Sequence, residues 1–251
     1  MHRILTRTMK PRAREIPWLR IERGTRDDYA ALAHWHYRAG SPATFARVLR
    51  AVDLDAPPSA TPTLAGVLVV SHPTLNGPWR QHAWPGALDA EASNHTDTPG
   101  ARARRLNAMV RTISRVIVDP RYRGGGVGSA LVRAYLDDPL TPLTEAIASM
   151  GTLVPLFTSA GMRAIDASCC TAHVRVMARA LRSRRIAPWQ LMDLREARRY
   201  CRNDTALVRE VRKWASASRA TRAASASMCD ASLLSLAAAS VAAPARVFVA
   251  P

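Results

Sequence analysis

Apolar and polar side chains alternate along residues 18–25, where the chain reads WLRIERGT, and this period of two predicts a first strand. Thr25 has the side chain of a helix N-cap, and Asp27 and Asp28 place negative charge in the turn that follows. These residues predict a helix that runs to about Tyr37, where a Gly-Ser-Pro sequence soon ends it.

Two further strands are predicted at residues 44–53 and 63–71, which are apolar runs separated by a Pro-rich segment. They are expected to form a hairpin with a long connection. Residues 72–100 are rich in Pro, Gly, Asn, His and Asp, so we expect a long irregular loop there, of a kind that is often functional. A short basic helix over 102–110 and a strand over 112–118 are predicted next.

Three consecutive glycines follow that strand, and after them the apolar positions return with helical spacing. Residues 143–149 then predict a fifth strand, and residues 152–162 predict a short helix that ends at Gly161. In the helix predicted directly after the glycines, the apolar positions of the amphipathic pattern are Val127, Ala130, Leu131, Ala134 and Tyr135.

The pattern changes beyond residue 165. Residues 170–217 are rich in arginine with helical spacing, residues 218–243 consist largely of Ala and Ser and predict weak order, and residues 245–250 predict a last strand. We therefore expect four parts, namely a basic flexible lead-in at 1–16, a core at 17–165, a helical extension at 166–217 and an Ala/Ser-rich tail at 218–251.

The charge of the chain changes the picture of its partners. Hydrophobic residues make up 48% of the chain, which predicts a folded core, but the formal net charge is +17. Such an excess favours polyanionic partners, and nucleic acid is the first to consider. Only Lys10 and Lys213 are lysines, so the basic charge is carried almost entirely by arginine, as it also would be in a protein from a GC-rich genome.

The compartment is expected to be reducing and cytoplasmic. The four cysteines form no C-x-x-C pair and no disulfide framework, and the N-terminal segment has no apolar core typical of a signal peptide. The apolar stretch near the C-terminus contains Pro244 and Arg246 and is a poor membrane span, so no membrane partner is expected. No metal site is predicted either, because His34 and His36 are two residues apart and face different sides of a helix.

The glycine cluster is the strongest chemical signal in the chain. A strand that enters a Gly-rich turn and then a helix presents unpaired backbone N–H groups at the positive end of the helix dipole, which suits a phosphate or pyrophosphate. No Lys-Ser/Thr pair follows the glycines, and Ser129 stands where a dinucleotide motif would have its third glycine. The pattern that does fit is R-x-x-G-x-G, over Arg123–Gly128.

This stretch, which follows Asp119-Pro120, resembles the acetyl-CoA pyrophosphate loop of the GNAT superfamily of N-acetyltransferases. The order of predicted elements over 17–165 is also similar, and the FTSAGM sequence at 157–162 resembles the end of that family's fourth helix. The resemblance implies an α/β (mixed α+β) fold with a twisted mixed sheet, helices on both faces, and strands that splay where acetyl-CoA or another acyl-CoA enters. It implies that the backbone of Val116, Ile117 and Val118 binds the pantetheine arm, and that Arg123, Gly124, Gly125, Gly126, Val127, Gly128 and Ser129 hold the pyrophosphate.

The catalytic residues are less clearly indicated. Acyl transfer to an amine needs a proton acceptor for the amine and a proton donor for the departing thiolate. At the position where many GNAT relatives have a donor tyrosine, this chain has Phe157, and the strand at 112–118 has no carboxylate. The replacements that we predict are Glu145, Tyr37 and His36. For each one the alternative is a structural role, as a strand-end charge, a packed residue or a cation at a helix end.

Three functions therefore remain open. The first is an acyl-CoA-dependent N-acyltransferase that transfers acetyl to an unknown amine directly in a ternary complex. The second uses the same fold on nucleic acid, because HYRAGSP (36–42) and GVLVVSHP (66–73) are loosely similar to phage Mom-type DNA-modifying enzymes. The third is a non-catalytic nucleic-acid-binding protein on an acyltransferase scaffold, which the absence of a donor at Phe157 favours. Arginine clusters at 101–105, 178–185 and 195–202 would contact phosphates in the latter two.

Overall fold

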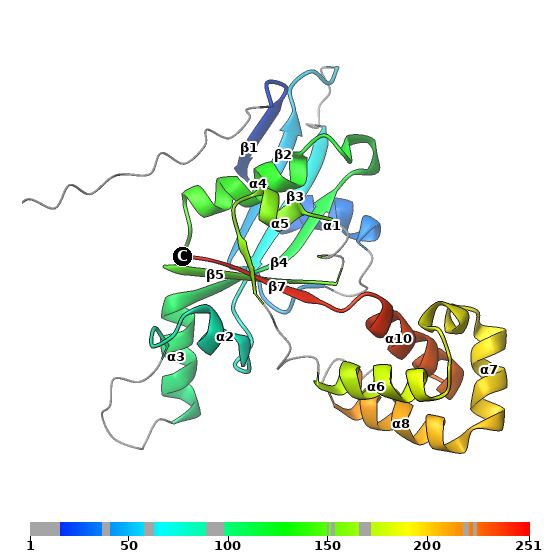
Figure 1. Ribbon diagram of the computed structural model, residues 1–251. Helices are drawn as coiled ribbons and strands as arrows, with labels where there is room; N and C mark the ends of the chain where they lie inside the picture. The colour runs from blue at the N-terminus through cyan, green and yellow to red at the C-terminus, as the bar shows by residue number, and fades with distance from the viewer. Residues whose placement is uncertain are drawn as a thin grey trace, which may run out of the picture.

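A mixed sheet of seven strands, with helices packed against it, forms the larger part of the molecule in the computed structural model (Figure 1). The structure describes residues 16–36, 41–57, 63–88, 98–149, 151, 154–165, 172–217, 221–222 and 225–251. The strand order is β1-β2-β3-β4-β5-β7-β6, and β4–β5 is a parallel pair among antiparallel neighbours. The mixed α/β fold expected from the sequence is thus confirmed. The strands are β1 (Leu19–Arg23), β2 (Arg47–Asp53), β3 (Leu64–Ser71), β4 (Val110–Val118), β5 (Leu143–Ala148), β6 (Arg163–Ile165) and β7 (Arg246–Ala250).

The helices follow the predicted pattern in the first half of the chain, with one addition. The segment expected to be an irregular loop at 72–100 contains the short helix α2, and the basic helix α3 begins earlier than predicted. The helical elements are α1 (Arg26–Leu32), η1 (Ala33–Trp35), α2 (Trp79–Ala83), α3 (Pro99–Met109), η2 (Pro120–Tyr122), α4 (Val127–Asp137), α5 (Leu156–Ser159), α6 (Ala172–Ser183), η4 (Pro188–Met192), α7 (Leu194–Asn203), α8 (Thr205–Ser216) and α10 (Asp230–Ala242).

Alternate residues of the central strands pack against helices on opposite faces of the sheet. Val67 and Val69 of β3 join Tyr29 of α1 in one cluster, whereas Leu68 and Val70 join α4 and α5 in the other. This is the arrangement expected when a strand is buried on both sides, and it explains why residues 64–71 read as a continuous apolar run. The two faces of β3 and β4 are therefore covered by different helices.

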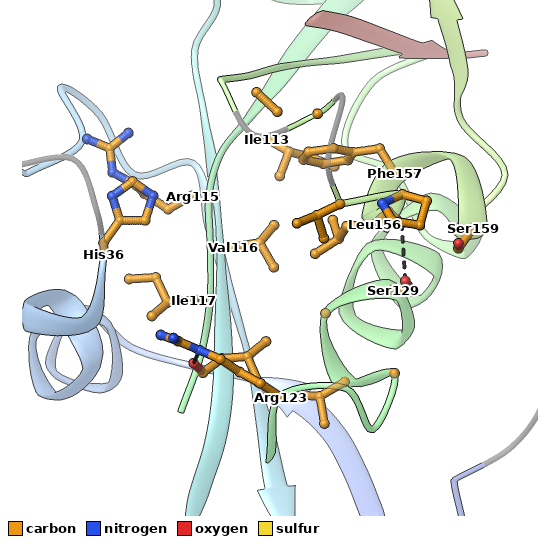
Figure 2. A pocket seen from close by; sticks show the side chains of 18 of the residues that line it. His36, Ile113, Arg115, Val116, Ile117, Arg123, Ser129, Leu156, Phe157 and Ser159 are labelled. Atoms are coloured by element: carbon orange, nitrogen blue, oxygen red, sulfur yellow. Dashed lines mark hydrogen bonds between the residues drawn. The ribbon is translucent and has the colours of Figure 1, made fainter. Parts of the chain in front are cut away.

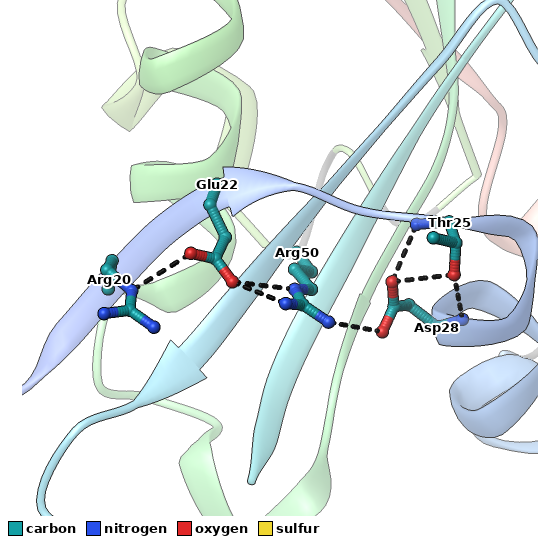
Figure 3. A network of polar contacts seen from close by, with 5 residues as sticks. All are labelled: Arg20, Glu22, Thr25, Asp28 and Arg50. Atoms are coloured by element: carbon teal, nitrogen blue, oxygen red, sulfur yellow. Dashed lines mark hydrogen bonds and ion pairs between the residues drawn. The ribbon is translucent and has the colours of Figure 1, made fainter. Parts of the chain in front are cut away.

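The start of α1 is held by a network of side chains (Figure 3). The Thr25 hydroxyl accepts from the Asp28 backbone N–H, and the Asp28 carboxylate accepts from the Thr25 N–H at 2.7 Å, which is the capping box. The guanidinium of Arg50 on β2 bridges this box to Glu22 on β1, with N–O distances of 3.3 Å to Asp28 and 2.7 Å to Glu22. The predicted N-cap at Thr25 is therefore tied to the sheet.

Helices α6, α7, α8 and α10 with η4 form a separate helical bundle, which Figure 1 shows to one side of the sheet. Its core includes Met177, Leu207, Trp214 and Leu234, each at most 5% exposed. The weak order expected for 218–243 differs from the structure at 230–242, where α10 buries five side chains in this core. The Ala/Ser composition concealed this helix, because it reads as a weakly ordered segment. Small side chains also allow close helix packing, however. In the chain, α10 is followed by β7. The bundle is therefore inserted in the sequence between the sheet strands β6 and β7.

Within the described residues, no helix combines the length and the apolar character that crossing a membrane requires.

Candidate functional site

The strand β4 has two different halves. Its first half pairs in parallel with β5, from Val110 opposite Leu143 to Ile113 opposite Ala146. Beyond Ile113 that pairing ends, although β5 continues and pairs with β7 on its other edge. The second half of β4 is thus hydrogen-bonded to β3 alone among the described strands, and one of its edges is open.

A β-bulge marks the change between the halves. Val70 of β3 lies opposite Ile113 and Val69 lies opposite Arg115, so Ser114 is the extra residue. The Ser114 hydroxyl donates to the Val69 carbonyl at 3.1 Å and lies 2.7 Å from the hydroxyl of Ser71. The bulge therefore keeps its polar groups satisfied while it turns the rest of β4 away from β5.

The ladder also fixes which backbone groups face the open edge. The Asp119 N–H donates to the Ala65 carbonyl at 3.0 Å, and hydrogen-bonded residues alternate along an antiparallel pair. Asp119 and Ile117 therefore bond to β3, whereas the N–H and C=O groups of Val118 and Val116 point to the other edge. The Arg123 side chain reaches the Val118 carbonyl at 3.2 Å on that side. The open edge thus presents peptide donors and acceptors in alternation.

The glycine turn leads from this strand into α4. Gly126 is the N-cap residue with a φ of 84°, in the left-handed region that glycine adopts without strain, and no side chain caps the helix. The first bond within the helix runs from the Ala130 N–H to the Gly126 carbonyl, so the N–H groups of Val127, Gly128 and Ser129 have no acceptor in the helix. These donors lie at the positive end of the helix dipole.

The residues before the glycines anchor the turn to the sheet. Asp119 accepts from the Arg121 backbone N–H and pairs with its guanidinium at 2.9 Å, and this hydrogen-bonded ion pair lowers the pKa of Asp119. The Tyr122 hydroxyl donates to Asp53 of β2 at 2.8 Å, and burial together with that carboxylate raises the pKa of Tyr122. The turn is therefore held in place before any ligand arrives.

A cavity of about 690 Å³ occupies the opening between β4 and β5, and this volume is within the range of sites that hold small ligands (Figure 2). It is lined from both sides of the sheet, because His36 follows η1 on the α1 side while Leu156 and Phe157 belong to α5 on the α4 side. Gly128 lets α4 and α5 approach here, since a Cβ at this position would lie 2.6 Å from Leu156. Two molecules could thus meet at the opening from opposite faces.

The structure brings together most of the residues predicted to bind the acyl-CoA. Gly125 is the one member of that set that does not line the cavity, and its Cβ position lies 3.3 Å from the Tyr122 carbonyl instead. The members that do line it are Val116, Ile117, Val118, Arg123, Gly124, Gly126, Val127, Gly128 and Ser129. The Ile117 side chain packs toward α1 and its backbone groups bond to β3, so of the three strand residues only Val116 and Val118 present peptide groups to the open edge.

Of the predicted catalytic residues His36 and Tyr37, the structure describes only the first. His36 lines the cavity and is half-buried at the end of η1. Tyr37 lies outside the described residues, as does most of the HYRAGSP segment. Phe157 lines the cavity and stacks on Phe248, with ring centroids 5.1 Å apart. The aromatic position at the cavity is therefore apolar, and Figure 2 shows His36 on the other side of β4 from Phe157.

Glu145 is placed elsewhere than expected. It was predicted as the carboxylate of the cleft, but it does not line the cavity and is 1% exposed. Its carboxylate accepts from Arg80 at 2.7 and 2.9 Å, from the Trp79 indole at 2.9 Å and from the Thr112 hydroxyl at 2.8 Å. All of these partners are side chains of the protein itself. Glu145 therefore joins α2, β4 and β5, beside the last paired residues of β4 and β5.

Several cavity residues were not predicted from the sequence. Trp35 of η1 lines it beside His36, and Ile147, Ala148, Gly151 and Val154 give its β5 side an apolar character. Their sequence signal is weak, because each is a single apolar or small residue near the end of an element. Arg80 was also missed as the partner of Glu145. The two residues are 65 positions apart, and Arg80 lies in a segment whose sequence reads as a loop.

No three His, Cys, Asp or Glu side chains come together to hold a metal ion in the parts of the chain that the structure describes. No protein-family model, curated protein or solved structure matches the chain.

Proposed function

We propose that the protein is an acyl-CoA-dependent N-acyltransferase, which transfers an acetyl group from acetyl-CoA directly to an amine. The observation that carries this proposal is the continuity of two binding features in one cavity. The open edge of β4 leads into the uncapped start of α4, so peptide groups suited to an amide-containing arm are followed by donors suited to a pyrophosphate. The resemblance of Arg123–Gly128 to the GNAT pyrophosphate loop supports the same assignment.

The donor would bind along this line. The N–H groups of Val127, Gly128 and Ser129 would bind the pyrophosphate oxygens, and the Arg123 guanidinium would add a charge-assisted bond. Val116 and Val118 would bond to the amides of the pantetheine arm at the open edge. The apolar residues of α5 and the end of β5 would cover the arm and exclude water from it.

The chemistry would take place near the bulge, where the cavity is reached from the His36 side as well. The amine nitrogen attacks the thioester carbonyl carbon, the carbon–sulfur bond breaks, and the products are an amide and the thiol of CoA. His36 is the residue that we assign to take the proton from the amine. Phe157 has no proton to donate, so the departing thiolate takes its proton from water.

The proposal is tested by isothermal titration of the protein with acetyl-CoA. Wild type is expected to bind saturably, and Gly126→Glu is expected to lose at least about 100-fold in affinity, because it puts a carboxylate where the pyrophosphate should bind. The matched control is Gly86→Glu. Gly86 also has a positive φ, of 77°, and nothing lies within 4 Å of its Cβ position, where Gly126 has only the Ile16 side chain at 3.6 Å, but Gly86 does not line the cavity.

Both variants should lose a similar amount of stability, about 1 to 2 kcal/mol, from the left-handed backbone. Only Gly126→Glu should lose the ligand. A folded wild-type protein that does not bind acetyl-CoA would refute the proposal, and so would equal affinities of the two variants. If binding is found, release of CoA thiol in the presence of different amines identifies the acceptor class.

A further inference from the structure

The basic charge of the chain is concentrated in the helical bundle. Residues 172–243 contain fourteen basic and five acidic residues, and so carry nine of the seventeen net positive charges in less than a third of the chain. The cavity between β4 and β5 accounts for none of these residues. A separate partner for this charge is therefore to be sought on the bundle surface.

The basic residues that the structure describes in the bundle helices fall into two groups. One group is neutralised internally, since Arg184 pairs with Asp204, Arg199 with Glu196, Arg212 with Asp230 and Lys213 with Glu210. The other group is exposed and makes no ion pair with a carboxylate anywhere in the described residues. It consists of Arg175, Arg179, Arg182, Arg185, Arg195, Arg198, Arg202 and Arg209, together with Arg222, which bonds to the Ser216 carbonyl.

The unneutralised arginines include a row on α6. Arg175, Arg179 and Arg182 follow the i, i+4, i+7 spacing that places side chains on one face of a helix, over a length of about 10 Å. They border a surface hollow whose described lining is formed by α6 residues. The opposite face of α6 carries Met177 and Leu181, which are buried in the bundle core. The row is thus fixed in direction by packing.

An exposed aromatic ring stands in the connection that follows this helix. Trp189 of η4 is 72% exposed, the highest value among the large hydrophobic side chains. Arg185 and Arg195 flank it in the sequence and both are exposed. Exposed rings among arginines are the combination with which proteins bind single strands, because bases stack on the ring while the guanidinium groups bind phosphates.

We propose that the helical bundle binds single-stranded nucleic acid, with the α6 arginine row on the phosphates and Trp189 stacked against a base. Charge complementarity selects a polyanion. A membrane surface fits less well, because the apolar face of α6 is already packed against the other helices of the bundle. An acidic protein fits less well because the cores of protein interfaces are depleted in charge. This proposal does not rest on the acyltransferase function.

The test is fluorescence anisotropy of the full chain with labelled single-stranded DNA and RNA of about 20 nucleotides, at about 0.1 M salt and across a salt series. The variant R175Q/R179Q/R182Q should bind at least about 10-fold more weakly. The slope of log affinity against log salt should fall by about 2, since three phosphate contacts are lost. The matched control R199Q/R212Q/K213Q removes the same net charge from residues that already have carboxylate partners, and should lose less than about 3-fold.

Trp189→Ala separates stacking from charge. It should weaken binding to the single strands about 10-fold and leave binding to a duplex of the same length unchanged. Gly126→Glu should bind nucleic acid as wild type does, which keeps this result distinct from that of the acetyl-CoA titration.

Equal losses in the two triple variants would overturn the proposal, because net charge alone would then explain the binding. It would also be overturned if folded wild type did not bind either single strand, or if poly-glutamate competed as well as DNA at equal charge. An equal effect of Trp189→Ala on duplex and single strands would overturn the stacking role of this residue.

Discussion

The helices α1 and α4 start in opposite ways. At α1 the side chains of Thr25 and Asp28 bond to each other's backbone N–H groups, and Arg50 ties the pair to the sheet. At α4 the N-cap is Gly126, which has no side chain, and the first N–H groups of the helix are left to the cavity. Side chains thus satisfy the N–H groups of Thr25 and Asp28 at the start of α1, whereas the N–H groups at the start of α4 are presented to the cavity.

The difference shows how the chain separates stability from binding. α1 is only seven residues long and gains from its cap. α4 does not need one, because Leu131, Val132 and Tyr135 are completely buried against the sheet. Packing of these side chains therefore holds the helix and leaves its start available for an anion. Substitutions at internally satisfied groups should change stability, and substitutions at the open start should change affinity.

The largest effect is expected at Glu145, whose carboxylate is satisfied entirely within the protein. Glu145→Ala leaves the guanidinium of Arg80 buried without its partner, so we expect a loss of about 3 to 5 kcal/mol in the free energy of unfolding. Urea denaturation measures this loss, and Glu145→Gln should lose less because it keeps part of the hydrogen bonding. A Glu145→Gln protein of normal stability that fails to turn over substrate would instead make this residue catalytic.

The next largest effect is expected at the closed start of α1. Asp28→Ala removes the capping box and the bond from Arg50, and should cost about 2 kcal/mol of unfolding free energy. Asp27→Ala is the control, because this neighbour lies in the same turn but makes no hydrogen bond or ion pair among the described residues, and it should cost less than about 0.5 kcal/mol. The affinity for acetyl-CoA should stay the same in both. A change in affinity with Asp28→Ala would break the separation between the two helix starts.

The open start should respond in the reverse way. Arg123→Ala should weaken acetyl-CoA binding about 10-fold, with unfolding free energy unchanged, because its side chain is exposed and bonds only to the Val118 carbonyl. Arg121→Ala, two residues earlier, removes a guanidinium that is paired with Asp119, and should change the affinity less than about 3-fold. Titration calorimetry of the two variants side by side decides whether the position or merely the charge matters.

The smallest effect is expected at Phe157. Phe157→Tyr adds a hydroxyl to a ring that already lines the cavity. We expect the equilibrium constant of unfolding and the rate of CoA release to stay within about 3-fold of wild type. Measured turnover with the amine found in the acceptor screen checks this. A loss greater than about 10-fold would mean that the cavity differs in shape from the one that binds an acyl-CoA.

The sequence predicted what depends on local pattern. The alternation at 18–25, the cap at Thr25 and the strand–glycine–helix order around Arg123 are all readable because neighbouring residues decide them. The α/β class follows from the succession of these elements. The residues that were missed depend on distant partners. Glu145 could not be assigned to a buried ion pair, because Arg80 lies in a segment whose composition conceals a five-residue helix. The opening between β4 and β5 depends on where strand pairing stops, which no single segment encodes.

The position of β7 has a consequence for how the molecule is made. This strand pairs with β5 on one side and β6 on the other, yet the whole bundle separates it from β6 in the chain. During translation, the ribosome must therefore deliver about 80 further residues after β6 before β5 acquires its second neighbour. Until then the apolar edge of β5 that pairs with β7 faces solvent. Exposed strand edges of this kind can pair with the wrong strand in a nascent chain. The bundle helices are thus synthesised before the strand that completes the sheet.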